Sequence, residues 1–119
     1  GNYQYASGYA AGKDIVKKRL VTAVFACNDV MAYGVYKAVK EAGLTVGKDI
    51  SVVGFDDLLF SSMLDVPLTS VQQNVKEIAE RASDILLCGI EGKEPTAAEG
   101  LSLPVLIERN SVLNLNAKQ

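Results

Sequence analysis

The stretch from Asp49 to Asp57 places the strongest constraint on how this chain can fold. It reads DISVVGFDD, a run rich in β-branched residues that ends in two adjacent carboxylates, Asp56 and Asp57. β-Branched side chains favour extended backbone, and a short apolar run bounded by turn residues is typical of a buried strand. The sequence therefore predicts a buried strand with both carboxylates at its carboxyl end.

A second strand and a helix are predicted immediately before this strand. Residues 22–27 form a short apolar run of the kind that is covered on both faces in a parallel sheet. Asn28 follows as a helix N-cap, and the helix is expected to extend from Asp29 to Ala42 and to end at Gly43. Strand, helix and strand together predict an α/β protein with a parallel sheet, in which such crossovers are right-handed in about 98% of cases.

Further elements are expected on both sides of this unit. Gly8 and Gly12 lie in an expected helix and are small enough to permit close approach to a sheet. The expected elements are a helix at Tyr5–Leu20, a short extended run at 68–71 after Pro67, an amphipathic helix at Val75–Glu91, a last strand at Leu101–Glu108 and a frayed tail after Asn110.

Length and charge exclude several classes of protein. The 119 residues suffice for one small domain with a core. The net charge of -2 and the pI of about 5.1 argue against nucleic-acid binding by this segment. Its only basic run, Lys17–Arg19, fits the last turn of a helix. No apolar run approaches the ~18 residues that span a bilayer.

The side-chain chemistry of the chain argues against an enzyme. The absence of histidine excludes Ser-His-Asp and Cys-His catalysis and histidine-ligated zinc. Cys27 and Cys88 lack metal-ligand spacing, so buried free thiols in a reducing cytoplasm are expected. Asp56 and Asp57 are a poor acid/base pair, because adjacent side chains of a strand point to opposite faces. We therefore expect no catalytic residues, no metal and no cofactor.

The polar residues after the two predicted strands suit a ligand site instead. Asn28-Asp29 and Asp56-Asp57 stand at the carboxyl ends of adjacent parallel strands, where the ligand crevice of open α/β sheets lies. Their oxygens, with the amide donor of Asn28, fit the hydroxyls of a small polar ligand. Asp56, Asn28 and Asp29 are the candidate ligand-binding residues. Helix capping is the alternative for Asn28 and Asp29, and a turn or surface ion pair is the alternative for Asp57.

Two tyrosines suggest an interface with another protein. Tyr33 and Tyr36 fall on the helix face opposite the apolar face that is expected to pack on the sheet. Aromatic side chains are enriched at interface centres, although two surface tyrosines are the alternative. An apolar loop at 58–64, which contains Phe60, is also expected to be covered by a partner.

Four segments carry motifs in an order and spacing that are specific. Residues 22–34 (TAVFACNDVMAYG) and residues 43–57 (GLTVGKDISVVGFDD) resemble the motifs TAIFAxNDxMAxG and GLxVPxDISVVGFDD of the LacI/GalR family of bacterial transcription repressors. Residues 67–73 (PLTSVQQ) are similar to PLTTVxQ, and residues 106–111 (LIERNS) are similar to LVxRxS. Gly47 replaces the usual proline, which affects only a turn.

The resemblance implies an effector-binding domain of the type I periplasmic-binding-protein fold. Such domains consist of two Rossmann-like lobes, which a small molecule closes like a hinge. Residues 1–72 would form mainly the C-terminal lobe, and residues 73–119 would supply a helix and a strand that cross to or pack on the N-terminal lobe. The DNA-binding headpiece and most of the first lobe would lie outside these 119 residues.

The resemblance also implies roles for particular residues. Positions that match Asn28 and Asp56 contact the effector in the family, and the helix and loop that match Val30–Val39 and Phe60–Leu64 contribute to the dimer interface. The candidate interface residues are therefore Tyr33, Tyr36, Phe60 and Leu64. The implied protein is a cytoplasmic homodimeric regulator that binds a small polar effector, most commonly a sugar. It would control operator DNA binding through the headpiece, with no cofactor and no membrane. A periplasmic sugar-binding protein of a transport system is the alternative.

Overall fold

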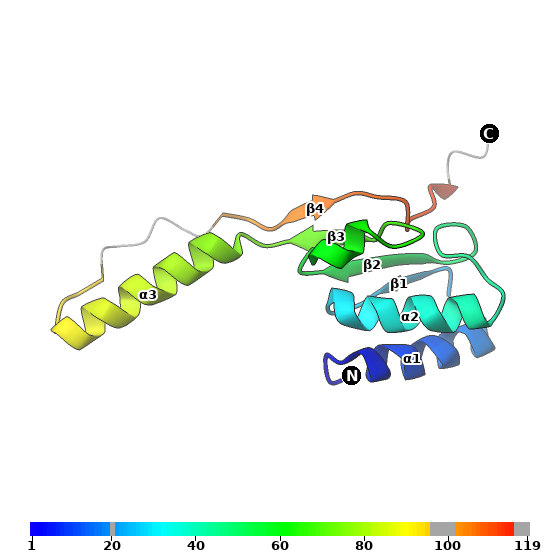
Figure 1. Ribbon diagram of the computed structural model, residues 1–119, viewed down its shortest axis with the longest axis horizontal. Helices are drawn as coiled ribbons and strands as arrows, with labels where there is room; N and C mark the ends of the chain where they lie inside the picture. Colours follow the sequence, from blue (N-terminus) through cyan, green and yellow to red (C-terminus); the bar gives the residue numbers. More distant parts are fainter. Residues whose placement is uncertain (20, 96–101, 116–119) are drawn as a thin grey trace. The chain divides into compact units, whose positions relative to one another are not determined.

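The computed structural model describes residues 1–19, 21–95 and 102–115 (Figure 1). The chain divides into two compact units, one formed by residues 1–72 with 106–119 and the other by residues 73–105. The elements, in chain order, are α1 (Tyr5–Lys18), β1 (Ala23–Phe25), α2 (Asp29–Glu41), β2 (Ser51–Phe55), the 3-10 helix η1 (Leu59–Ser62), β3 (Thr69–Gln72), α3 (Val75–Glu91) and β4 (Val105–Ile107). The predicted ends at Leu20 and Leu101 lie outside the described residues.

The strands form one sheet in the order β1-β2-β3-β4, and β1, β2 and β3 run parallel. Val24 pairs with Val52 across the first interface, and Gly54 pairs with Ser70 across the second. The strand–helix–strand unit predicted around Asp49–Asp57 is therefore confirmed. Because the three strands are parallel, their carboxyl ends meet at one edge of the sheet.

Helix α2 covers one face of this sheet. Along β2 the residues alternate, so that Val52 and Gly54 are buried while their neighbours are half-exposed. The core consists of Ala26, Ala32, Val35, Val39, Val46, Ile50, Val52 and Leu68. The expectation that residues 22–27 are covered on both faces is wrong for this chain, since Phe25 is 61% exposed. Phe25 is exposed because side chains alternate along β1, so that within this strand only Val24 faces the side covered by the core.

Helices α1 and α2 lie side by side and approach each other through glycines (Figure 1). A Cβ at Gly8 would lie 2.1 Å from the carbonyl oxygen of Met31, and a Cβ at Gly34 would lie 2.4 Å from that of Tyr5. Only glycine fits where two backbones approach this closely, because it has no Cβ. The small residues Gly8 and Gly12 therefore allow approach to a helix, and not to a sheet as the sequence suggested.

The chain returns to the first unit within β4, at Leu106, and is anchored there by Ser111. Ser111 is fully buried, and its hydroxyl donates to the carbonyl of Val52 at 2.6 Å and accepts from the amide of Thr69 at 2.8 Å. The amide of Val52 donates to the Ser111 carbonyl at 2.9 Å. The frayed tail expected after Asn110 is thus wrong for Ser111, and residues 116–119 lie outside the described part. The division by contacts groups residues 106–119 with 1–72. The assignment of residues 1–72 and 73–119 to the two lobes of the family stays a prediction.

The second unit contains helix α3, whose bounds match the prediction. Asn74 caps it by accepting a hydrogen bond from the amide of Glu77 at 3.2 Å, and Gly92 ends it at a φ of 67°. None of its residues is buried. The apolar face that the sequence predicted is therefore open along the described helix.

We expect Gly8→Ala to destabilise the first unit by about 1–3 kcal/mol, the usual cost of overpacking. The added methyl group would meet backbone atoms of Met31, which cannot move without shifting helix α2. Urea unfolding followed by circular dichroism measures the change. Gly89→Ala in α3 is the matched control, since a Cβ there meets nothing within 4 Å. Equal stability of the Gly8 variant and the wild type would contradict the close packing.

Candidate ligand-binding edge of the sheet

Asn28 and Asp56 both lie at the carboxyl edge of the sheet, because β1 and β2 are parallel neighbours. Asn28 is half-buried and caps α2, with its side-chain oxygen accepting from the amide of Met31 at 2.8 Å. Its amide group donates to the carbonyl of Tyr3 at 3.0 Å. The capping alternative is therefore correct for the Asn28 oxygen.

Asp56 begins a turn with unusual backbone geometry. Its φ is 101° and that of Asp57 is 50°, and residues other than glycine rarely adopt such positive φ values. The amide of Asp56 donates to the carbonyl of Val71 at 2.9 Å, which ties the turn to β3. Such conformations cost about 1–3 kcal/mol and concentrate at ligand clamps and active sites. The geometry therefore favours a functional role for the half-buried Asp56.

Asp29 is placed inside the protein and not at its surface. Its carboxylate is 0% exposed and accepts from the amide of Leu58 at 2.8 Å and from the hydroxyls of Ser61 at 2.5 Å and Ser70 at 2.6 Å. Gly54 makes room for it, since a Cβ there would lie 2.1 Å from the Asp29 oxygen. This geometry argues against the prediction that Asp29 contacts a ligand, because its carboxylate is enclosed and hydrogen-bonded within the chain.

Asp57 forms an ion pair, although the alternative predicted for it was a turn or a pair at the surface. One oxygen lies 2.7 Å from the Nη1 atom of Arg109, and the other accepts from the side-chain amide of Gln72 at 2.9 Å. The pair is not at the surface, since 8% of the Asp57 side chain and 19% of the Arg109 side chain are exposed. Sequence reasoning missed Arg109, although it lies in the closing motif LIERNS.

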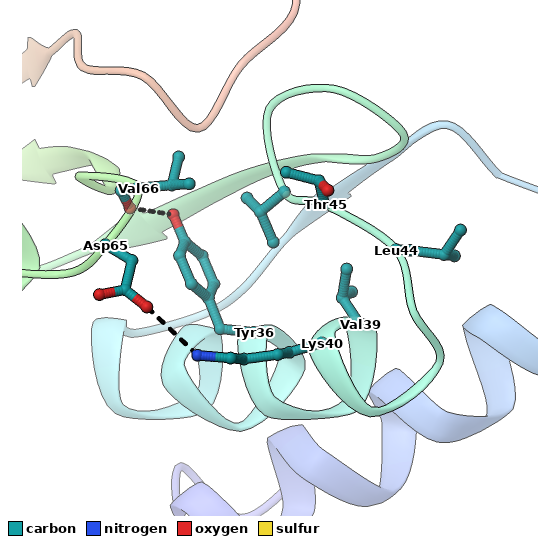
Figure 2. A pocket seen from close by; sticks show the side chains of 8 residues that line it. Tyr36, Val39, Lys40, Leu44, Thr45, Asp65 and Val66 are labelled. Atoms are coloured by element: carbon teal, nitrogen blue, oxygen red, sulfur yellow. Dashed lines mark hydrogen bonds and ion pairs between the residues drawn. The ribbon is translucent and has the colours of Figure 1, made fainter.

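Tyr33 and Tyr36 are engaged by their own chain. The Ser61 hydroxyl donates to Asp29, so the Tyr33 hydroxyl, 2.8 Å away, donates to Ser61. Tyr36 donates to the carbonyl of Val66 at 3.0 Å, as Figure 2 shows. Burial raises the pKa of both phenols, that of Tyr36 to about 12. The prediction that these tyrosines point away from the core is wrong, because the loop after β2 folds over their helix face.

The other two candidate interface residues differ from each other. Leu64 is half-buried and packs against the core, whereas Phe60 is 66% exposed. Phe60 lies on η1 between Leu59 and Met63, which are also exposed. Of the four candidate interface residues, Phe60 therefore lies on an exposed apolar surface, whereas the two tyrosines and Leu64 are half-buried.

A small pocket of about 220 Å³ lies beside Tyr36 (Figure 2). The Lys40 ammonium and the Asp65 carboxylate, 3.2 Å apart, stand at its rim. The residues that line it are Tyr36, Val39, Lys40, Leu44, Thr45, Val46, Asp65 and Val66. Neither Asn28 nor Asp56 belongs to this lining, so the pocket is separate from the candidate ligand edge.

Metal-binding clusters and membrane-spanning helices are both absent from the described residues. Among residues 1–19, 21–95 and 102–115, no group of three or more histidine, cysteine, aspartate or glutamate side chains could hold a metal ion. Within the same residues, no helix is long and apolar enough to cross a membrane. Cys27 is exposed and Cys88 is half-buried, which corrects the expectation that both thiols are buried.

Comparison with known proteins identifies the class. A family model described as periplasmic binding protein-like domain matches residues 2–112. The ribose operon repressor of Escherichia coli (strain K12) is 39% identical over 114 residues, covering 93% of this chain and 34% of that protein. The HTH-type transcriptional repressor PurR of Histophilus somni (strain 129Pt) is 39% identical over 118 residues, covering 97% of this chain and 35% of that protein.

Solved structures agree with these sequence relatives. The lac repressor dimer bound to operator and the anti-inducer ONPF superposes with a TM-score of 0.82 at 35% identity, covering 96% of this chain and 40% of that one. A LacI family transcriptional regulator from Enterococcus faecium with bound ribose gives 0.81 at 26% identity, covering 95% and 42%.

The parallel sheet, the edge that carries Asn28 and Asp56, and the matching family model together define a periplasmic binding protein-like domain. Within that class the chain belongs to the LacI/GalR family, as part of its effector-binding domain. It spans about a third of the length of the curated relatives that it matches.

We expect the phenol of Tyr36 to titrate near pH 12. Tyrosinate absorbance should show a titration component at this pH in the wild type, and this component should be absent from Tyr36→Phe. Its folded pKa exceeds the ordinary value of 10.0, so the buried neutral phenol stabilises the fold below pH 10. That contribution is lost as the pH rises from 10 to 12. Tyr3→Phe, which alters an exposed ring, should leave the component in place. A single titration at the ordinary pKa would contradict the burial of Tyr36.

We expect Asp29→Asn to lower the free energy of unfolding by about 1.5–3 kcal/mol, because the amide turns a donor toward groups that now donate to a carboxylate. Urea unfolding measures the loss. Asp65→Asn is the matched control, because this side chain is 91% exposed and pairs only at the surface with Lys40. Its effect should stay within about 0.5 kcal/mol. Equal effects of the two substitutions would show that Asp29 is not a buried anchor.

Proposed function

We propose that this chain is the C-terminal part of the effector-binding domain of a LacI-type transcriptional regulator. The observation that carries the proposal is the pair Asn28 and Asp56 at the shared carboxyl edge of two parallel strands, in a chain whose relatives are named as repressors. Those names favour the regulator over the transport alternative. In the regulator, operator DNA is bound by a separate headpiece, in a cytoplasmic protein.

The proposed ligand is a small polar effector, and a sugar is the first candidate. A carboxylate accepts hydrogen bonds from two hydroxyls at once, which suits the adjacent hydroxyls of a sugar. Asp56 lies in the strained turn at this edge, and Asn28 caps α2 at the same edge. One relative is named as a ribose operon repressor and one similar structure carries ribose. A purine is the second candidate, since the family resemblance implies that purines also occur as effectors.

The role of the edge is binding and not catalysis. The groups at the edge are hydrogen-bond acceptors and donors, and binding between two lobes would shift the population of conformations that differ in operator affinity. A ligand can shift this population only by the difference between its affinities for the two conformations. We therefore expect Asp56 to contribute more in the closed conformation than in the open one.

The second partner is another copy of the chain. Leu59, Phe60 and Met63 are 71%, 66% and 67% exposed, and they form an apolar surface on η1. Apolar aromatic and methionine side chains are enriched at interface cores. One similar structure is described as a dimer. We propose that η1 contributes to a homodimer contact. Tyr33 and Tyr36 contribute indirectly, because their hydrogen bonds hold the loop after β2 in place.

Substituting Asp56 tests the ligand role. In the complete gene product, we expect Asp56→Ala to weaken effector binding by about tenfold or more, because a hydrogen bond to a charged group contributes about 1.5–3 kcal/mol. Titration calorimetry against ribose, sucrose and hypoxanthine measures the affinities. Operator affinity without effector should stay unchanged.

Asp49→Ala is the matched control, since Asp49 is exposed at the opposite end of the same strand. It should leave the effector affinity unchanged. Equal affinity of the wild type and Asp56→Ala for a ligand that the wild type binds would refute the assignment of Asp56. A complete gene product that binds no operator DNA would refute the proposal that the protein is a LacI-type regulator.

A further inference from the structure

The carboxylate of Asp57 joins segments that are far apart in the chain. Its two oxygens contact Gln72 at the end of β3 and Arg109 after β4, at 2.9 and 2.7 Å. Its amide donates to the Ser70 hydroxyl at 3.1 Å, and that hydroxyl donates in turn to Asp29. One residue therefore connects the turn after β2 with β3, with the returning chain and with the buried carboxylate.

Arg109 is fixed from several sides. Its Nη1 atom donates to the carbonyl of Leu68 at 2.7 Å, in addition to its contact with Asp57. Its backbone amide donates to the hydroxyl of Thr69 at 2.9 Å. A guanidinium held by two acceptors loses little freedom on pairing, since its planar fork is pre-organised. The side chain is therefore a rigid connection between Asp57 and the start of β3.

The two contacts of Asp57 lie where the chain leaves the first unit and where it returns. Gln72 is the last residue of the first unit before residues 73–105, and Arg109 follows the return at Leu106. Both contacts lie within the first unit. An ion pair at the surface would contribute little, but this one is largely shielded from solvent, where loss of one partner is costly.

The same residue sets the backbone of the candidate ligand turn. Asp56 and Asp57 both have positive φ values, and such backbone persists only where the surroundings hold it. The holding contacts are the Asp56 amide on Val71, the Asp57 amide on Ser70 and the Asp57 carboxylate on Gln72 and Arg109.

We propose that Asp57 and Arg109 are positioning residues that hold Asp56 and both connections to the second unit as one rigid piece. A ligand bound at Asp56 then acts on both connections together, a consequence that rests on the function proposed above. The ligand-contacting residue is Asp56, and Asp57 and Arg109 act through it. Their own contacts are with Gln72, Ser70 and Leu68.

Hydrogen exchange and NMR on the 119-residue chain without ligand test this proposal. In Arg109→Met, we expect exchange at the amides of Asp56 and Asn110 to accelerate by about 10- to 100-fold, the range for losing a hydrogen bond to a charged group. The side-chain amide signal of Gln72 should shift as well, although Gln72 contacts Asp57 and not the substituted residue. Exchange at Ala26 and Ser51, which are bonded to Val53 and Thr22, should stay unchanged.

Lys40→Met is the matched control, because it removes the exposed ion pair with Asp65 and should change none of these signals. Gln72→Leu is a second, milder variant that removes one contact of Asp57, and it should accelerate exchange at Asp56 without loss of the fold. Acceleration of hydrogen exchange by one common factor at all amides would show only that a structural contact is lost, and it would overturn the proposal. Unchanged signals of Asp56 and Gln72 in Arg109→Met would likewise overturn the proposal. Since no ligand is present, neither outcome depends on whether the gene product binds a sugar.

Discussion

The enclosed carboxylate of Asp29 is the interaction on which the rest of the first unit depends. A buried charge is costly unless it is fully hydrogen-bonded, and this one accepts from an amide and two hydroxyls that belong to the loop after β2, to η1 and to β3. It also lies in the first turn of α2, where the helix dipole favours negative charge. One side chain thereby joins helix, loop and strand at the edge that carries Asn28 and Asp56.

The surface of the protein follows from this anchor. Because Asp29 holds Ser61, and Ser61 accepts from Tyr33, the loop after β2 lies against α2 and takes up both phenols. On this loop, Leu59, Phe60 and Met63 remain exposed. The interface that we propose is therefore a product of how the loop is held, and the tyrosines contribute to it only through the loop.

Two carboxylates that are adjacent in sequence thus have different roles. The turn is anchored through Asp57, whose partners lie within the first unit, and Asp56 beside it is the residue that we propose as the ligand contact. The family relationship explains why such an edge would carry a ligand, because it is the crevice side of an open α/β sheet. The chain covers about a third of the length of its relatives.

Local periodicity, caps and contiguous motifs were enough to predict the parallel strands, the helices between them, the family and the position of Asp56. They could not predict that Asp29 and Ser111 are buried and that Tyr33 and Tyr36 are bonded within the chain, because this depends on tertiary contacts. A carboxylate after a strand looks the same in sequence whether it faces solvent or is enclosed. What decides is whether donors from distant segments reach it, and the Asp29 and Ser111 partners come from other segments of the fold. Periodicity describes one element at a time, and burial depends on what the other elements bring to it.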